Sequence, residues 1–161
     1  GMEDVDVPEH RLVDPARHAH KNRDPERTPM QWRRDGGFSG KGIEPWLPYG
    51  DTERINVEDQ AKDPASMLSL YRKLIWLRRK SDALRFGDYV AIDGLPDTVY
   101  AYTRTHGSDR VVVALNFGND DVTFTLPDDA RPTAFLAGTH DDAPASAEMT
   151  LRGNEGRVYR C

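Results

Sequence analysis

The sequence has little cysteine and no long apolar run. Its one cysteine, Cys161, is the last of 161 residues, so an internal disulfide is excluded and a reducing compartment is compatible. No run approaches the roughly 18 apolar residues that span a bilayer, and no segment has the pattern of a secretory signal peptide. A net charge of −5 gives no electrostatic reason to expect nucleic acid or an anionic membrane as a partner. These absences predict a soluble, cytoplasmic protein.

Signatures of cofactor chemistry are also missing. The sequence contains no Walker-type phosphate loop, no Gly-x-Ser-x-Gly and no Cys-x-x-Cys. His18 and His20, with His10 nearby, supply fewer ligands than the four of a structural zinc site, and we interpret them as surface histidines. We therefore expect no cofactor and no metal. A (β/α)8 barrel takes about 250 residues, so a complete one is excluded by length.

Residues 1–62, which we call the arm, combine scattered prolines with a glycine cluster at residues 36–42. Proline removes a backbone donor and restricts the residue before it, so long helices and central strands are not expected here. An irregular segment of this length is unusual in a compact domain. Something must hold the arm in place, and a second copy of the chain is the simplest candidate.

Residues 63–81 have the pattern of a helix. Asp63 is a suitable N-cap and Pro64 suits the first helical position. The apolar positions cover more than one face: Met67, Leu68, Leu70, Tyr71, Leu74, Ile75, Trp76 and Leu77. A helix that is apolar on two sides is expected to pack against two neighbours.

Residues 82–161 have the pattern of an antiparallel β domain. The predicted strands are Gly87–Ile92, Thr98–Thr105, Arg110–Phe117, Asp121–Leu126, Thr133–Leu136, Met149–Leu151 and Val158–Arg160. Val111–Leu115 is apolar throughout, as in a strand that is buried on both faces. The polar, glycine-rich segment 151–157 argues against a regular strand at Val158–Arg160. The fold class is therefore mainly β, a meander or Greek-key-like sandwich preceded by one long helix and the irregular arm.

One segment is more specific than any of these patterns. Residues 23–32 read RDPERTPMQW, and Gly37–Phe38, Pro45–Trp46–Leu47–Pro48 and Ile55–Asn56–Val57–Glu58 follow in order. This series resembles the α-glucosidase branch of the α-amylase superfamily, which includes oligo-1,6-glucosidases. The resemblance implies that the arm is the loop after the eighth barrel strand, that 63–81 is the last barrel helix, and that 82–161 is domain C.

The resemblance also implies what this chain does not contain. Family members hydrolyse glucosides with three barrel carboxyls, and none of these can be carried over to a position here. In the family, an arginine of this motif lies in the sugar pocket, which makes Arg27 a candidate substrate-binding residue. Gln31 and Trp32, together with Met30 and Trp46, could line a sugar site. The alternative is that the aromatic residues only anchor the arm.

Three functions follow from this interpretation. The first is a truncated C-terminal part of an α-glucosidase-type glycoside hydrolase that is inactive alone. The second is a complementation subunit that docks on a separately encoded barrel. The third is a carbohydrate-binding module for an α-glucoside or oligosaccharide. In each case the uncovered helix face predicts a homodimer formed through the arm and the helix.

Overall fold

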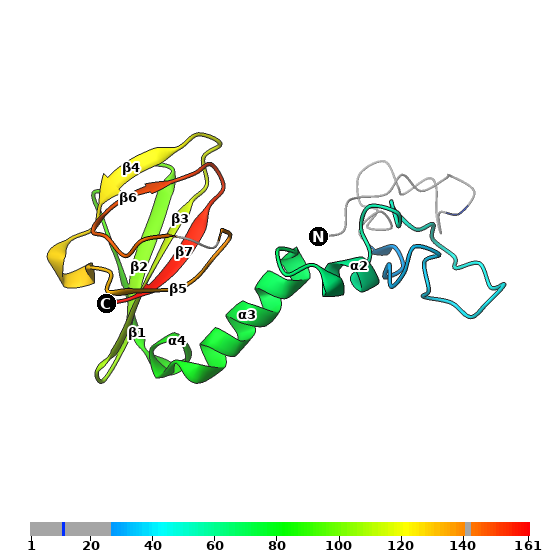
Figure 1. The fold of residues 1–161 in the computed structure, drawn as a ribbon, viewed down its shortest axis with the longest axis horizontal. Coiled ribbons are helices and arrows are strands. Elements are labelled where there is room, and N and C mark those ends of the chain that lie inside the picture. The colour runs from blue at the N-terminus through cyan, green and yellow to red at the C-terminus, as the bar shows by residue number, and fades with distance from the viewer. Residues whose placement is uncertain (1–10, 12–26, 141–142) are drawn as a thin grey trace. The chain divides into compact units, whose positions relative to one another are not determined.

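The computed structural model describes residue 11, residues 27–140 and residues 143–161. The chain divides into two compact units, Gly1–Ser69 and Leu70–Cys161, and each is described by itself (Figure 1). The first unit holds the arm, and the second unit is mainly β. The predicted histidine group His10, His18 and His20 lies outside the described residues.

The described part of the arm is mostly irregular but ends in one short helix, α2 (Val57–Lys62). Asn56 is its N-cap, with a side-chain oxygen that accepts from the backbone N–H of Asp59 at 2.8 Å. Glu58 and Asp59 lie in the first turn, where negative charge complements the helix dipole. The proline-rich pattern did not predict this helix, because capping signals are local and the prolines around them dominate the composition.

Helix α3 (Met67–Lys80) begins later than the sequence predicts. The predicted N-cap at Asp63 is wrong, because Asp63 caps the C-terminus of α2 and its N–H bonds to the carbonyl of Gln60. The chain then turns through Pro64 and Ala65. Ser66 takes over the expected role, and its hydroxyl accepts from the backbone N–H of Ser69 at 3.2 Å.

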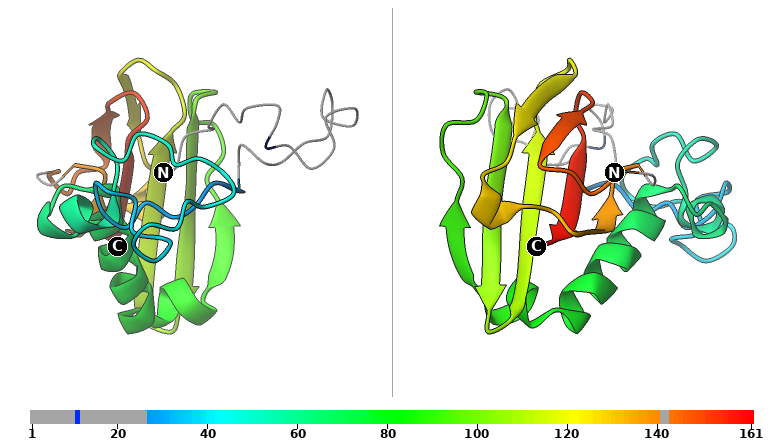
Figure 2. Two further views of the ribbon diagram at one scale, coloured as in Figure 1. Left: turned by 90° about the vertical axis from the view of Figure 1, so that its right-hand side faces the viewer. Right: turned by 60° about the vertical axis from the view of Figure 1, so that its left-hand side comes forward.

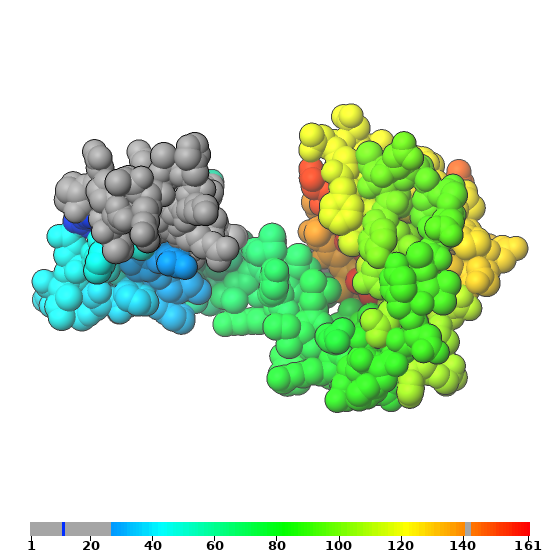
Figure 3. All heavy atoms as spheres, turned by 180° about the vertical axis from the view of Figure 1, so that it is seen from behind, coloured from blue at the N-terminus to red at the C-terminus, as the bar shows by residue number. Residues whose placement is uncertain are grey.

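No residue of α3 is buried. Its large apolar side chains Met67, Tyr71, Ile75 and Trp76 are between 51% and 62% exposed. The atoms of this part of the chain are drawn in green in Figure 3. Leu70, Leu74 and Leu77 are half-buried. The helix therefore presents apolar surface that the described residues leave uncovered.

A short helix, α4 (Asp82–Phe86), leads into the β unit and was not predicted. Ser81 caps it, and the carboxylate of Asp109 accepts from the Ser81 hydroxyl at 2.7 Å and from the Ala83 N–H at 2.9 Å. The hydrogen bond from Ala83, followed by that from Ser81, holds the pKa of Asp109 below its usual value. One carboxylate thus joins the start of α4 to the hairpin formed by β2 (Val99–His106) and β3 (Asp109–Asn116).

The β unit is an antiparallel sandwich, as predicted. The larger sheet has the order β1 (Asp88–Ala91), β2 (Val99–His106), β3 (Asp109–Asn116), β7 (Gly156–Arg160) and β5 (Ala134–Gly138). The smaller sheet pairs β4 (Val122–Thr125) with β6 (Glu148–Leu151). After β3 the chain alternates between the two sheets, which lie face to face (Figure 2).

The core of the sandwich is apolar. Phe124, Met149 and Leu151 of the smaller sheet form one buried cluster with Val112 and Tyr159 of the larger sheet. On the other face of β3, Val111 and Val113 pack with Ala83 of α4. The prediction that Val111–Leu115 is buried on both sides is confirmed for its first four residues, while Leu115 is half-buried.

The last strand exists despite its polar approach. Glu155 is 2% exposed, and its carboxylate accepts from the Arg157 guanidinium at 2.7 and 3.0 Å and from the Arg152 N–H at 2.7 Å. Burial acts to raise the pKa of Glu155, but the bonds from Arg157 and Arg152 keep it lowered. The polar residues of this turn are paired with each other, so β7 can enter the centre of the sheet.

Candidate functional site

The arm is organised around the buried side chain of Gln31, which is 5% exposed. Its amide nitrogen donates to the carbonyls of Ile55 and Asp51, the latter at 3.3 Å, and its oxygen accepts from the N–H of Gly50 at 3.0 Å. One side chain thus joins three points of an irregular backbone. Buried backbone N–H and C=O groups require hydrogen-bond partners. Outside regular secondary structure, a side-chain amide can supply both a donor and an acceptor.

The backbone of the RTPMQW motif also forms hydrogen bonds with the N-terminus of α2. The carbonyl of Gln31 accepts from the N–H of Val57 at 2.9 Å, and that of Trp32 accepts from the N–H of Glu58 at 3.0 Å. These N–H groups have no partner within a helix. The motif and α2 therefore support each other, although they are about 25 residues apart in the sequence.

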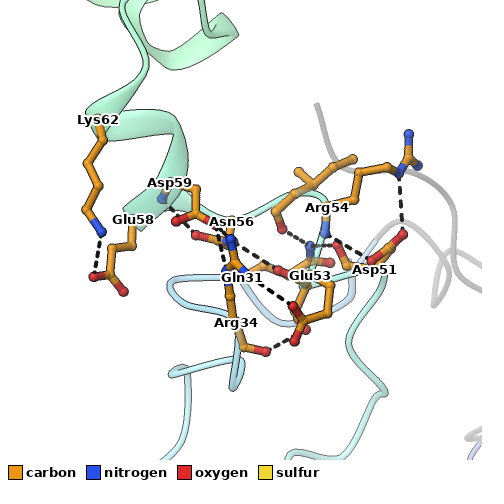
Figure 4. A network of polar contacts seen from close by, with 11 residues as sticks. Gln31, Arg34, Asp51, Glu53, Arg54, Asn56, Glu58, Asp59 and Lys62 are labelled. Carbon is orange, nitrogen blue, oxygen red and sulfur yellow. Dashed lines mark hydrogen bonds and ion pairs between the residues drawn. The ribbon is translucent and has the colours of Figure 1, made fainter.

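A charged network continues outward from α2 (Figure 4). Asp59 accepts from Asn56 at 2.9 Å and from Arg34 at 3.0 Å, and these bonds, Asn56 first, lower its pKa. Arg34 also approaches Glu53 at 3.5 Å. Glycoside hydrolysis needs one carboxyl with a raised pKa. Among the residues that the structure describes, the shifted carboxyls Asp59, Asp109 and Glu155 all have lowered values.

A glycine turn positions Phe38 next to this scaffold. Gly36 and Gly37 have φ values of +88° and +70°, and a Cβ at Gly36 would lie 2.4 Å from the ring of Tyr49. Only glycine fits this close approach with positive φ. The Tyr49 hydroxyl accepts from the N–H of Phe38 at 3.0 Å. The backbone of Phe38 is thereby held while its ring stays 58% exposed.

Trp46 is held from its edge. Its indole N–H donates to the carbonyl of Arg11 at 2.7 Å, and the Arg11 guanidinium donates back to the carbonyl of Trp46 at 3.4 Å. Arg11 also forms an ion pair with Glu44. The ring of Trp46 nevertheless remains 65% exposed. The polar edge is satisfied and the apolar faces are open.

Phe38 and Trp46 border an open hollow of about 620 Å³, which we call the arm hollow. Its lining is mostly apolar, and its two charged residues are Arg27 and Glu44. The complete lining is Arg27, Thr28, Pro29, Met30, Phe38, Ser39, Ile43, Glu44, Pro45, Trp46 and Leu47. This volume is within the roughly 300–1,000 Å³ of small-molecule sites. An apolar lining with a few polar groups is also typical of such sites.

The structure separates the three residues that the sequence grouped as substrate-binding candidates. Arg27 lines the arm hollow, and its side chain makes no hydrogen bond or ion pair within the described part of the chain. Gln31 lies inside the scaffold, with its amide already bonded. Trp32 is 48% exposed but is not part of the hollow. A sugar contact by any of the three remains a prediction.

Sequence reasoning missed Phe38 and Glu44 as members of this site. The available signal was the double glycine at Gly36–Gly37, which marks a turn that presents the next side chain. Met30 and Trp46, which were predicted from the sequence as possible lining residues of a sugar site, do border the hollow.

The residues that the structure describes show neither a metal site nor a membrane-spanning helix. They contain no group of three or more His, Cys, Asp or Glu side chains that could hold a metal ion. None of their helices combines the length and the apolar character that crossing a membrane requires.

Comparison with known families divides the chain in two. The alpha-amylase catalytic-domain family matches residues 1–87, and the family of the C-terminal domain of the alpha-amylase SusG matches residues 99–158.

Curated relatives match most of this chain but only part of themselves. An oligo-1,6-glucosidase of Parageobacillus thermoglucosidasius is 36% identical over 148 residues, which are 88% of this chain and 26% of the relative. An alpha-glucosidase of Saccharomyces cerevisiae is 31% identical, over 86% of this chain and 25% of the relative. A trehalose-6-phosphate hydrolase of Bacillus subtilis is 37% identical, over 87% and 26%. The chain thus spans about a quarter of the length of these relatives.

Solved structures give the same picture. The trehalulose synthase of Pseudomonas mesoacidophila superposes with a TM-score of 0.78 at 34% identity, over 86% of this chain and 26% of that protein. The isomaltulose synthase of Klebsiella sp. LX3 superposes with a TM-score of 0.79 at 34% identity, again over 86% and 26%.

Proposed function

This chain belongs to the alpha-amylase family, and we propose that it supplies the C-terminal part of an α-glucosidase-type glycoside hydrolase. On this proposal, the arm contributes a wall of a sugar site, and the sandwich is a structural domain. The substrate is an α-glucoside or a short oligosaccharide. The proposed location of the protein is the cytoplasm, and the support for this is its single cysteine, Cys161.

The observation that carries the proposal is the arm hollow, which is lined by Arg27 and by the exposed aromatic residues Phe38 and Trp46. Arginine presents a rigid fork of donors that can bond a carboxylate and sugar hydroxyls together. Hydrolysis further needs two carboxyls about 5–10 Å apart across a cleft, one of them a proton donor. The chain spans only about a quarter of the length of its relatives, which supports the proposal that this chain alone does not turn over substrate.

Complementation by a barrel is the test of this function. The barrel part of the Parageobacillus oligo-1,6-glucosidase relative, produced without its own C-terminal quarter, would be mixed with this chain. We expect hydrolysis of isomaltose by the mixture and none by either part alone. Arg27→Lys keeps the charge but loses the fork, and should lower the rate of the mixture. An equal rate with Arg27→Ala would contradict a role in substrate binding.

Alongside any of these functions, we also propose a homodimer formed through the arm and α3, which the exposure of the helix favours. Met67, Tyr71, Ile75 and Trp76 are each more than half exposed, and apolar patches of several hundred Å² are uncommon on monomers. Light scattering on the purified chain should give twice the monomer mass. The double variant Tyr71→Glu with Ile75→Glu should give the mass of a single monomer. A monomer at micromolar concentration without these substitutions would exclude the dimer.

A carbohydrate-binding module without a barrel is the third candidate. It is supported by the exposed rings of the arm and predicts saccharide binding with no gain on adding a barrel. Complementation that restores hydrolysis would exclude it.

A further inference from the structure

We infer that the arm hollow is a saccharide-binding site in which Phe38 and Trp46 are the stacking residues and Trp32 has no part. The ligand class, a neutral α-linked glucosyl saccharide, rests on the proposed function. The assignment of the stacking residues rests on the geometry of the arm.

Trp46 has the arrangement that stacking requires. Its indole N–H is bonded to the carbonyl of Arg11 at 2.7 Å, so the polar edge is satisfied without a ligand. The ring is 65% exposed and borders the hollow. A pyranose has an apolar C–H face that packs against such a ring. Because the edge is already fixed, the ligand need not order the side chain, which lowers the entropic cost of binding.

Phe38 is a second, independently held ring in the same hollow. The positive φ of Gly36 and Gly37 and the bond from the Phe38 N–H to Tyr49 at 3.0 Å fix its backbone. The turn that holds Phe38 and the backbone bond that holds Trp46 do not share residues. Both residues border the same hollow, which is large enough for a small saccharide.

The charged residues select a hydroxylated ligand over a purely apolar one. Arg27 forms no hydrogen bond with the described residues and offers N–H donors, and Glu44 offers carboxylate oxygens as acceptors beside its ion pair with Arg11. An apolar ligand would bury the charge of Arg27 without a partner, which is unfavourable. A saccharide supplies hydroxyls that both donate and accept. One positive and one negative side chain also give no preference for a charged ligand.

The test is calorimetric titration of the full chain with maltose and isomaltose. Trp46→Ala and Phe38→Ala should each weaken binding about tenfold, as loss of a buried aromatic anchor does in other interfaces. Trp32→Ala is the matched control, because its ring is also about half exposed but lies outside the hollow, and it should leave affinity unchanged. Trp46→Phe keeps a ring and should retain more affinity than Trp46→Ala. Circular dichroism of each variant checks folding.

Three results would overturn the inference. The first is equal weakening by Trp32→Ala and Trp46→Ala. The second is binding of p-nitrophenol as tight as that of p-nitrophenyl α-glucoside, which would make the hollow an apolar site. The third is no saccharide binding at millimolar concentration. In that case complementation by the barrel could still succeed, so the proposed function is judged separately.

Discussion

The arm and the sandwich hold their shape in opposite ways. Among the described residues, every buried side chain of the apolar core lies between Ala83 and Tyr159, whereas the arm buries the polar side chains of Thr28, Gln31 and Asn56. The sandwich is stabilised by apolar contact, which depends on volume and is not directional. The arm is stabilised by hydrogen bonds between side chains and irregular backbone, which depend on atom type and position.

Exposure of aromatic rings alone does not distinguish the two regions. Phe38 and Trp46 of the arm are exposed, and the sandwich, although it buries Phe124 and Tyr159, also exposes Tyr89, Tyr100 and Phe117. What distinguishes the rings of the arm is that Phe38 and Trp46 border one hollow, in a segment held from inside by the amide of Gln31.

The largest expected effect is in the sandwich core. Leu151→Ala removes a fully buried side chain of β6 and should lower the free energy of unfolding of the β unit by about 2–5 kcal/mol. Thr125→Ala, at an exposed position of the paired strand β4, is the control and should change it by less than about 0.5 kcal/mol. Urea denaturation followed by circular dichroism measures both. Similar losses for the two variants would mean that the core is not where stability resides.

A smaller but more specific effect is expected in the arm. Gln31→Met keeps the side-chain length and removes the bonds to Gly50, Asp51 and Ile55. Each buried group left without a partner costs about 1–3 kcal/mol. Hydrogen exchange at the Gly50 and Val57 amides should accelerate, while exchange in β3 stays unchanged.

Glu53→Gln, a change at an exposed side chain of the same network, is the control for Gln31→Met and should leave the exchange of Gly50 as it was. Unchanged exchange in Gln31→Met would show that the arm does not depend on its amide.

The smallest effect concerns the carboxylate that joins α4 to the β2–β3 hairpin. Asp109→Asn should lower the free energy of unfolding of the β unit by about 1 kcal/mol at neutral pH, because a charged cap is lost. The folded pKa of Asp109 is below its unfolded value. Its contribution is therefore complete above an unfolded pKa of about 4 and is lost as pH falls through the folded pKa.

The free energies of unfolding of the original chain and of Asp109→Asn should thus differ at pH 7 and converge as the pH falls through the folded pKa of Asp109, below about 4. Thr125→Ala, which changes no charge, is the control and should show no such convergence. A difference that persisted unchanged at low pH would assign the effect of Asp109 to packing and not to charge.

The sandwich could be predicted from sequence because its signals are local. Alternation in Val99–Thr105 and the apolar run in Val111–Leu115 each specify which faces of a strand are buried. The polar segment before the last strand, Gly156–Arg160, argued against that strand. Its polar side chains are satisfied by the pairing of Glu155 with Arg157, and a sequence pattern does not reveal such a contact.

The arm could be predicted only in part. The motif identified Arg27, but no pattern indicates that Gln31 turns inward while Trp32 stays outside the hollow. These positions depend on partners about 20 residues away, such as Gly50 and Ile55, which irregular backbone brings together without periodicity. The start of α3 was misplaced for a similar reason, since both Asp63 and Ser66 are good caps in isolation.

The central claim is that this chain supplies the C-terminal part of a glycoside hydrolase and has no turnover alone. Hydrolysis of p-nitrophenyl α-glucoside by the purified 161-residue chain tests it most directly. The account predicts no release of p-nitrophenol above the uncatalysed rate. Release that is abolished by replacing one carboxylate of this chain, such as Glu44→Gln, would show an active site within these residues and contradict the account.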